Sequence, residues 1–280
     1  MKTLPFTIPK PKRDALILQE DLVKYFYDSL HRHEELQISC IVKGSGTLIV
    51  GDRVSSYFEG DILVIGGKVS HVFKSDPADK KSHMFSIFFT EDSFGSHFFQ
   101  TEELKTLIPF FRKAENGFKI KSNFQKSKSL FQKIRKAPKL DRFILFLQLL
   151  KELNNARYDS LSSFISEKKY SDLEEKRMSA VLEYTMDNFR REISLSEIAE
   201  QATMTKNAFC AYFKKRTRKT YVTFLNELRT EASCQLLSGT NDLSIAEIAE
   251  RSGFQNISNF NRVFKVFKKQ TPGQYRKQFS

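Results

Sequence analysis

The sequence predicts a two-domain α+β protein, in which an antiparallel β domain with accompanying helices precedes an all-α domain. Residues 30–90 consist of short runs rich in β-branched and aromatic residues, separated by glycine-containing turns at intervals of about eight to twelve residues. Residues 193–280 instead carry apolar residues at helical spacing, and the pattern occurs twice. A chain of 280 residues is long enough to form two hydrophobic cores.

The repeat in the C-terminal part rests on two matches. The sequence Ile-Ala-Glu at 198–200 recurs 50 residues later at 248–250, and Phe-Lys at 213–214 recurs 51 residues later at 264–265. One extra residue in the second turn explains the difference. Each copy reads as a short helix, a tight turn and a longer helix with inward aromatic residues, which is the pattern of a helix-turn-helix. A single copy would fit an ordinary helical bundle better, but two copies with polar and basic outer faces favour DNA binding.

The segment between the two copies is predicted to be one unbroken helix, because the apolar residues of 220–238 follow a single stripe. At about 1.5 Å per residue it is about 28 Å long. That length is close to the roughly 34 Å between successive major-groove faces of B-DNA. We therefore expect this helix to act as a spacer that sets two recognition helices on the same side of the duplex. A further helix is predicted at 174–188.

Residues 176–280 resemble the DNA-binding domain of the AraC/XylS family of bacterial transcription regulators, with almost no gaps. The residues that carry the resemblance are Phe213, Lys214, Lys215, Phe224, Leu225, Arg229, Leu236, Leu237, Ile245 to Ala249, Gly253, Phe254, Phe260, Arg262 to Lys265, Thr271, Pro272, Tyr275 and Arg276. The resemblance implies a sequence-specific regulator that binds promoter half-sites as a homodimer and activates transcription by contacting RNA polymerase. Its signal is either an unidentified small-molecule effector or, in the alternative, a protein partner or the abundance of the regulator itself. Thr203, Arg218 and Lys269 stand where the family usually has turn glycines, so these turns must change geometry or tolerate strain.

The resemblance also assigns DNA contacts by position. The base-contact candidates are Asn207, Cys210 and Ala211 in the first copy and Ser258, Asn261 and Arg262 in the second. Arg can bind guanine O6 and N7, and Asn can bind adenine N6 and N7, with about 1–3 kcal/mol of discrimination for each pair. Ala211 offers only a methyl contact, and Arg262 has a rival role as a phosphate or intraprotein partner. The phosphate-contact candidates are Lys206, Lys214, Lys215, Lys265 and Lys268, and the alternative for each is a solvated surface charge.

The formal net charge of +13 suits a polyanionic partner such as DNA. Residues 171–280 hold 18 Lys and Arg against 13 Asp and Glu, so most of the excess lies outside the repeat and does not by itself prove DNA binding. The three isolated cysteines have no metal-ligand spacing and fit a reducing compartment. Neither a signal peptide nor a membrane-spanning segment is evident, so we expect a cytoplasmic protein with no membrane partner.

The N-terminal strands resemble a cupin barrel. His31 and His33 precede the first strand of residues 30–90, and His71 opens a later one. In cupin enzymes this pattern holds a metal with three His and an acid, a ligand set suited to Mn, Fe, Ni or Zn. Here Gln37 stands where the resemblance places the Glu ligand.

Glu34 and Glu35 are possible substitutes for that ligand. We favour an empty site, with no metal and no cofactor, in which the histidines make local hydrogen bonds. His31, His33, Gln37 and His71 then become candidates for an effector pocket. The alternative is a metal-dependent cupin enzyme with an accessory helical domain, whereas the preferred interpretation is a regulator that is not an enzyme.

Residues 139–153 form a predicted helix that is apolar around most of its surface, so it must be buried on more than one side. One side is a candidate dimer seam, and the equally supported alternative is that both sides are core. The seam candidates are Leu140, Phe143, Ile144, Leu147 and Leu150. We expect a cupin-like effector and dimerisation domain at 1–155, a linker at 156–173 and the DNA-binding domain at 174–280.

Overall fold

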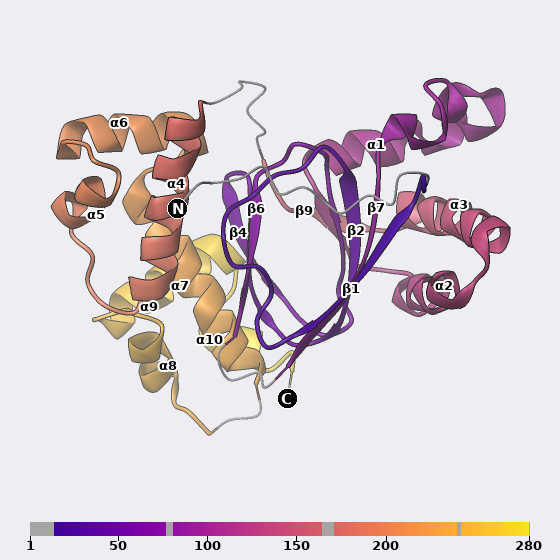
Figure 1. Cartoon of the computed structure of the whole chain (residues 1–280). Coiled ribbons are helices and arrows are strands. Elements are labelled where there is room, and N and C mark those ends of the chain that lie inside the picture. Colours follow the sequence, from indigo (N-terminus) through magenta and orange to yellow (C-terminus); the bar gives the residue numbers. More distant parts are fainter. Residues whose placement is uncertain (1–13, 77–80, 164–170, 240–241, 280) are drawn as a thin grey trace.

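The computed structural model describes residues 14–76, 81–163, 171–239 and 242–279. A β-rich N-terminal region with its own helices lies beside a helical C-terminal region (Figure 1). The two-domain α+β organisation is therefore confirmed. The described strands form two antiparallel sheets, and no closed barrel is found among them.

The larger sheet has six strands in the order β1-β7-β2-β5-β8-β9, and all neighbours are antiparallel. Its strands are β1 (Ile17–Val23), β2 (Leu36–Lys43), β5 (Ile62–Ile65), β7 (Ser82–Phe89), β8 (Phe118–Ile120) and β9 (Tyr158–Ser160). Strand β9 lies within 156–173, the segment that we expected to be the linker, and it pairs with β8. This part of the segment therefore belongs to the sheet.

The smaller sheet has three strands in the order β4-β3-β6, namely β3 (Gly46–Val50), β4 (Arg53–Tyr57) and β6 (His71–Ser75). Alternate residues of β3 serve two different cores, because successive side chains of a strand point to opposite faces. Leu48 and Val50 pack with residues of the larger sheet, whereas Ile49 packs on the opposite side. The two sheets thus face each other, but no described ladder joins the smaller sheet to the larger one, which leaves the barrel open.

Helices cover the outer face of the larger sheet. They are α1 (Ile108–Glu115), α2 (Phe124–Lys136) and α3 (Lys139–Asn155), preceded by the 3-10 turns η1 (Glu91–Phe94), η2 (Phe98–Gln100) and η3 (Glu102–Leu107). The core between sheet and helices is rich in phenylalanine: the rings of Phe89 and Phe146 lie 4.8 Å apart, centroid to centroid. The abundance of Phe in the sequence is thus largely accounted for by packing.

Among the described residues of the C-terminal region, all regular secondary structure is helical. The helices are α4 (Asp172–Asn188), α5 (Leu195–Gln201), α6 (Lys206–Thr217), α7 (Tyr221–Ser238), α8 (Ile245–Arg251), α9 (Ile257–Lys268) and α10 (Pro272–Arg276). Helix α7 runs unbroken for 18 residues, as the sequence predicts. In Figure 1 the pair α5–α6 lies above the pair α8–α9, with α7 between them. None of the described helices is long and apolar enough to cross a membrane.

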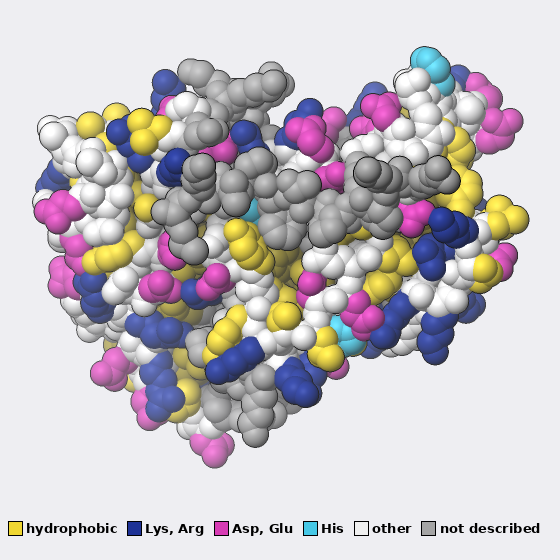
Figure 2. Space-filling model, viewed as in Figure 1, with side chains coloured by type: hydrophobic (Ala, Val, Ile, Leu, Met, Phe, Trp, Pro, Cys, Tyr) yellow, Lys and Arg dark blue, Asp and Glu magenta, His cyan; other side chains and the backbone are white. Residues whose placement is uncertain are grey.

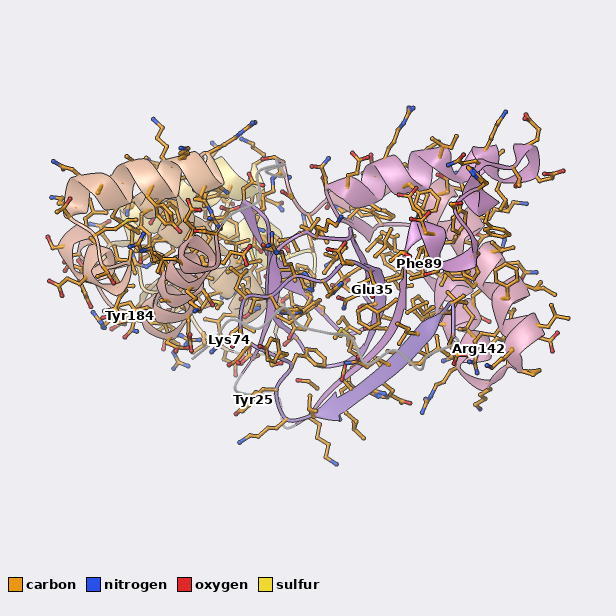
Figure 3. All side chains as sticks on the ribbon, turned by 45° about the horizontal axis from the view of Figure 1, so that its top comes forward. Tyr25, Glu35, Lys74, Phe89, Arg142 and Tyr184 are labelled. Carbon is orange, nitrogen blue, oxygen red and sulfur yellow. The ribbon has the colours of Figure 1, made fainter. Side chains whose placement is uncertain are left out.

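The outer face of the smaller sheet packs directly on α4 and α7. Ile49, Val54 and Val72 belong to the same apolar cluster as the buried residues of these two helices. Lys74, which lies between the two regions in Figure 3, pairs with Asp187 of α4 at 2.9 Å. The molecule is therefore layered: helices α1–α3, larger sheet, smaller sheet, then the C-terminal helices.

Candidate nucleic-acid interface and effector cavity

The two short helices of the repeat begin in the same way. The side chains of Ser194 and Ser244 accept hydrogen bonds from the backbone N–H groups of Glu197 and Glu247, and each Glu accepts one in return from the Ser N–H. Arg191 also donates to Glu197 and is the main cause of its pKa falling to about 2. These reciprocal bonds fix the start of α5 and of α8.

The two tight turns also match. Thr203 and Gly253 both have positive φ, 55° and 88°, and their N–H groups donate to Glu200 and Glu250 at 2.9 and 2.8 Å. A Cβ on Gly253 would lie 2.4 Å from the carbonyl oxygen of Phe189, so only glycine fits there. The first turn has the same backbone conformation at Thr203, although a β-branched residue ordinarily avoids positive φ.

The longer helices of the repeat, α6 and α9, are capped by Thr205 and Asn256, whose side chains accept backbone N–H bonds of the first turn. Helix α9 starts 51 residues after α6, which confirms the extra residue in the second turn. All six base-contact candidates are exposed on these helices: Asn207, Cys210, Ala211, Ser258, Asn261 and Arg262. Phe209 and Phe260 on the opposite sides are fully buried.

Arg262 already has one partner inside the protein. Its Nη2 donates to the Oδ1 of Asn259 at 2.8 Å, one helical turn away. The guanidinium carries five N–H donors, so this bond leaves donors for a nucleic acid. Arg262 therefore does have the intraprotein partner that the sequence left open, and this hydrogen bond is compatible with a contact to DNA.

Four of the five phosphate-contact candidates, Lys206, Lys214, Lys215 and Lys265, are exposed. Lys268 differs, because it is largely buried and pairs with Glu231 of α7. Burial alone disfavours its charge, but the attraction of Glu231 raises the pKa of Lys268 above its usual value. Figure 2 shows that the Lys and Arg side chains of the helical region are interspersed with acidic ones.

Arg218 and Lys269 end α6 and α9 in left-handed conformations, with φ of 55° and 59°. Their N–H groups donate to the carbonyls of Lys214 and Lys265 at 2.8 and 3.0 Å. The backbone thus keeps the turn that glycine usually supplies and tolerates a side chain in it. Of the two possibilities that the sequence left open, strain is the one observed.

The three histidines that the sequence marked as candidates for an effector pocket come together between the two sheets. The possible ligand atoms of His31, His33 and His71 lie within 4.8 Å of one another. Burial lowers the pKa of His31 to about 4 and that of His71 well below its usual value, so both rings are neutral at neutral pH. Gln37 joins them, with its Oε1 3.2 Å from the Nε2 of His33.

The two glutamates considered as substitutes for Gln37 do not join this cluster. Glu34 is exposed and pairs with Lys68 at 3.0 Å. Glu35 is buried, and its carboxylate lies 3.9 Å from the Nδ1 of His33, on the far edge of the ring from Gln37.

A cavity of about 300 Å³ adjoins the histidines. It is lined by Gln19, Asp21, Val23, Tyr25, Phe26, Tyr27, His31, His33, Gln37, Phe73, Met84 and Phe88, which include no Lys or Arg. Tyr25, one of the lining residues, is labelled at the edge of the β region in Figure 3. The sequence interpretation missed the β1 residues 19, 21 and 23, because residues 18–23 show no alternation of apolar and polar side chains that would have marked a strand.

Helix α3 presents only part of the predicted dimer seam. Leu140 and Ile144 are exposed, with 71% and 47% of their surface accessible, and Figure 2 shows hydrophobic side chains at the surface around α3. Phe143 packs on Phe94, and Leu150 is fully buried in the protomer core. The helix thus contributes both to the core and to an apolar surface.

Two acidic residues of α7 were not singled out from the sequence. Glu227 accepts from the backbone N–H of Val54 at 3.3 Å and pairs with Lys219 at 2.6 Å. Glu231 accepts from the hydroxyl of Ser56 at 3.0 Å. Two acids four residues apart on the apolar side of a helix were the signal that could have found them, because buried carboxylates require partners.

Sequence comparison supports the interpretation of the C-terminal part as a helix-turn-helix domain. Residues 198–278 match the family described as a helix-turn-helix domain. YdeC of Bacillus subtilis, named as an uncharacterized HTH-type transcriptional regulator, is 24% identical over 256 residues, which cover 90% of this chain and 87% of that protein. A similarly named regulator of Staphylococcus aureus strain COL is 24% identical over 253 residues, and the match spans 88% of this chain and 32% of that protein. The structure of ToxT from Vibrio cholerae superposes with a TM-score of 0.39 at 16% identity, covering 95% of this chain and 98% of that one.

Proposed function

We propose that the chain is a DNA-binding transcription regulator of the AraC type, in which one protomer reads two successive major-groove segments of promoter DNA through α6 and α9. The match of residues 198–278 to a helix-turn-helix domain and the similarity to HTH-type transcriptional regulators support this proposal. The observation that carries this proposal is the duplicated geometry. Both helices follow the same cap and turn, bury their aromatic side and expose a polar side. Helix α7, about 27 Å long at 1.5 Å per residue, supplies the spacing.

The proposed base contacts follow from the chemistry of each exposed side chain. Asn207 and Asn261 suit adenine, and Arg262 suits guanine. Ser258 accepts or donates a hydrogen bond to several bases, while Cys210 and Ala211 offer small contacts such as one to the thymine methyl group. The second copy therefore carries more of the base discrimination than the first.

Phosphate contacts are proposed for Lys206, Lys214, Lys215 and Lys265. Such contacts fix register on the duplex and carry no sequence information. Lys268 is proposed to tie α9 to α7 instead, since its ammonium group already pairs with Glu231. It becomes available to a phosphate only if that pair opens.

Regulation is proposed to pass through the N-terminal region, a cupin-like domain that ends after β9 and precedes a DNA-binding domain at 174–280. A small molecule in the cavity beside His31, His33, Gln37 and His71 would favour one arrangement of the smaller sheet on α4 and α7. Such a ligand changes DNA binding only if it binds one state of the protein more tightly than the other. The packing of the smaller sheet on α7 is the physical link through which the cavity would influence the DNA-binding helices.

Leu140 and Ile144 of α3 are proposed as the centre of a homodimer seam, which would place two DNA-binding domains on repeated half-sites in the cytoplasm. Activation by contact with RNA polymerase is proposed from the AraC resemblance. The comparisons do not favour a metal-dependent cupin enzyme, and we propose that the chain acts by binding rather than by catalysis.

The test is selection of binding sites from random duplex DNA by the full chain, followed by hydroxyl-radical footprinting. We expect two protected patches for each protomer on one face of the duplex, about 10–10.5 base pairs apart. A single protected patch, or equal binding to all sequences, would contradict the proposal.

A further inference from the structure

Two carboxylates of α7, Glu227 and Glu231, lie one helical turn apart against strand β4 of the smaller sheet, which runs beside α7 (Figure 1). Glu227 accepts a hydrogen bond from the backbone N–H of Val54 at 3.3 Å, and Glu231 accepts one from the hydroxyl of Ser56 at 3.0 Å. Four residues of a helix rise about 6 Å, and two residues of a strand rise about 6.7 Å. The spacings match, so one docking position of β4 satisfies both carboxylates.

Each carboxylate also binds a lysine at the end of one of the longer helices of the repeat. Lys219 lies two residues after the end of α6 and pairs with Glu227 at 2.6 Å. Lys268 is the last residue of α9 and pairs with Glu231. In both pairs one carboxylate oxygen faces the lysine and the other faces β4. The two copies of the repeat are therefore tied to the same strand in the same way.

The packing of β4 keeps both ion pairs away from water. Glu227 and Glu231 are buried, with only 8% and 7% of their surface accessible. Burial raises the pKa of Glu227 above its usual value although Lys219 attracts the charged form, so this carboxylate depends on its partners. The attraction between opposite charges is stronger inside a protein than in water. Each pair is therefore held most firmly while β4 covers it.

We propose that Glu227 and Glu231 are positioning residues, which hold the C-terminal ends of α6 and α9 at a fixed separation while β4 is docked on α7. Withdrawal of β4 exposes both ion pairs to water and loosens the two ends together. Buried aromatic residues of α6 and α9 also pack on α7, so this change frees the ends of the helices without unfolding them. The inference rests on the proposed function, in which α6 and α9 read successive segments of one site.

The consequence for DNA binding is selectivity for spacing. Two recognition helices at a fixed separation fit two segments only at one distance, whereas loosened helices tolerate a segment that is displaced by one base pair. The sheet on which α7 rests also borders the histidine cavity through His71, the first residue of β6. A ligand that shifts the smaller sheet would thus change the spacing preference of both helices through the same two carboxylates.

The first measurement needs no DNA. Cys210 on α6 is exposed, and Asn261→Cys adds an exposed thiol on α9, so spin labels on both report the distance between the helices by pulsed electron paramagnetic resonance of the full chain. We expect one narrow distribution of distances. Glu231→Gln should make it about 1.5 times as wide, because charge-assisted hydrogen bonds are roughly twice as strong as neutral ones. The control is Glu183→Gln, which removes an exposed carboxylate of α4 and should leave the width unchanged.

A second pair of variants tests whether β4 acts through Glu231. Ser56→Ala removes the hydroxyl that donates to this carboxylate and should widen the distribution as well. In a chain that already carries Glu231→Gln it should add little, because the hydroxyl then has no charged pair to support. Lys268→Gln opens the same pair from the lysine side, so it takes the place of Glu231→Gln if that variant folds poorly.

The second measurement is the affinity of the unlabelled proteins for the selected site and for versions with one base pair added or removed between the two segments. We expect the native chain to lose about tenfold in affinity on the altered sites, as for a mismatched base pair. Glu231→Gln should lose only about threefold on the same scale. Glu183→Gln carries the same change of charge and should discriminate like the native chain.

The positioning role is overturned if Glu231→Gln and Lys268→Gln leave the distribution as narrow as in the native chain. It is also overturned if the effects of Ser56→Ala and Glu231→Gln on the width are additive, or if spacing discrimination survives in Glu231→Gln. Wider distributions in these variants, together with a native chain that does not distinguish DNA sequences, would support the positioning role and refute the proposed function alone.

Discussion

Arg262 and Lys265 are three residues apart on the exposed side of α9, and both are positively charged. Their chemistry differs, because a planar guanidinium can form two parallel hydrogen bonds to one guanine, whereas an ammonium acts as a point charge. Removing either side chain should therefore weaken DNA binding in a distinguishable way.

We predict that Arg262→Ala relaxes preference at one base position, with a loss of about 1–3 kcal/mol for the selected site and much less for random DNA. Lys265→Ala is the matched control and should weaken all sequences alike, with a salt dependence shallower by about one unit. The measurement is fluorescence anisotropy over a range of salt concentrations. Equal losses on selected and random DNA for Arg262→Ala would remove it from base recognition.

We predict that Cys210 is the thiol that a maleimide modifies in the native protein, and that bound DNA protects it. Cys210 is exposed on α6, whereas burial raises the pKa of Cys40 to about 11 and that of Cys234 to about 12, so little thiolate forms on either at pH 8. Mass spectrometry of digested protein with and without the selected site gives the result. Modification of Cys210 at the same rate in both samples would place this side of α6 away from the duplex.

At the residue scale the sequence predicted which side chains face outward but not which of them are already engaged. Asn207 and Arg262 are exposed, as helical periodicity requires. Lys268 continues the same basic pattern, yet it pairs with Glu231. The packing of α9 on α7 brings Lys268 and Glu231 together, and a single sequence does not show which helices pack on each other.

The two turns of the repeat provide a test at the scale of the element. Thr203 is β-branched and exposed at φ 55°, whereas Gly253 at φ 88° has no room for a Cβ. We predict that Thr203→Gly raises the free energy of unfolding by about 0.5–1 kcal/mol, because relief of left-handed strain exceeds the entropy that glycine adds to the unfolded chain. Gly253→Ala should lower it by about 2 kcal/mol or more.

Urea unfolding followed by circular dichroism measures both effects. The control is Glu183→Gly, at an exposed position inside α4, which should lower the free energy of unfolding by about 0.7–1 kcal/mol. If Thr203→Gly destabilises as much as Glu183→Gly does, the positive φ at 203 stores no strain.

Elements with strong local patterns were predictable, and those that depend on distant partners were not. The stripe of 220–238 predicted α7, and the repeated Ile-Ala-Glu predicted α5 and α8. Strand β1 contains Gln, Glu and Asp, which are uncommon in strands, and it is formed by its pairing with β7. Strands β8 and β9 have three residues each, too few for any period to show.

At the scale of the whole molecule, the smaller sheet and α7 share one apolar cluster, so we predict that the two regions unfold together. Val54→Asp would bury an unpaired charge in that cluster and should split calorimetric unfolding into two transitions. The control is Leu22→Asp, the same kind of change at an exposed strand position, which should leave one transition. Two transitions in the native chain would mean that the regions are energetically independent.

The arrangement of the domains was beyond the reach of the sequence. Short β-rich runs predicted an antiparallel β domain, but nothing in them distinguishes a closed barrel from two facing sheets. Every residue of β3, from Gly46 to Val50, is buried, so this strand is covered on both faces. The helical region covers the outer face of β3, although the sequence interpretation expected this region to be separated from the β domain by a linker.

The central claim is that α6 and α9 of one protomer read different segments of one site. The most direct measurement is the affinity of the native chain, Asn207→Ala and Arg262→Ala for the selected site and for versions in which each segment in turn is scrambled. The account predicts that Asn207→Ala becomes insensitive to scrambling of one segment only, and that Arg262→Ala becomes insensitive to the other only. If both variants lose sensitivity to the same segment, or if neither does, the two helices do not divide the site between them.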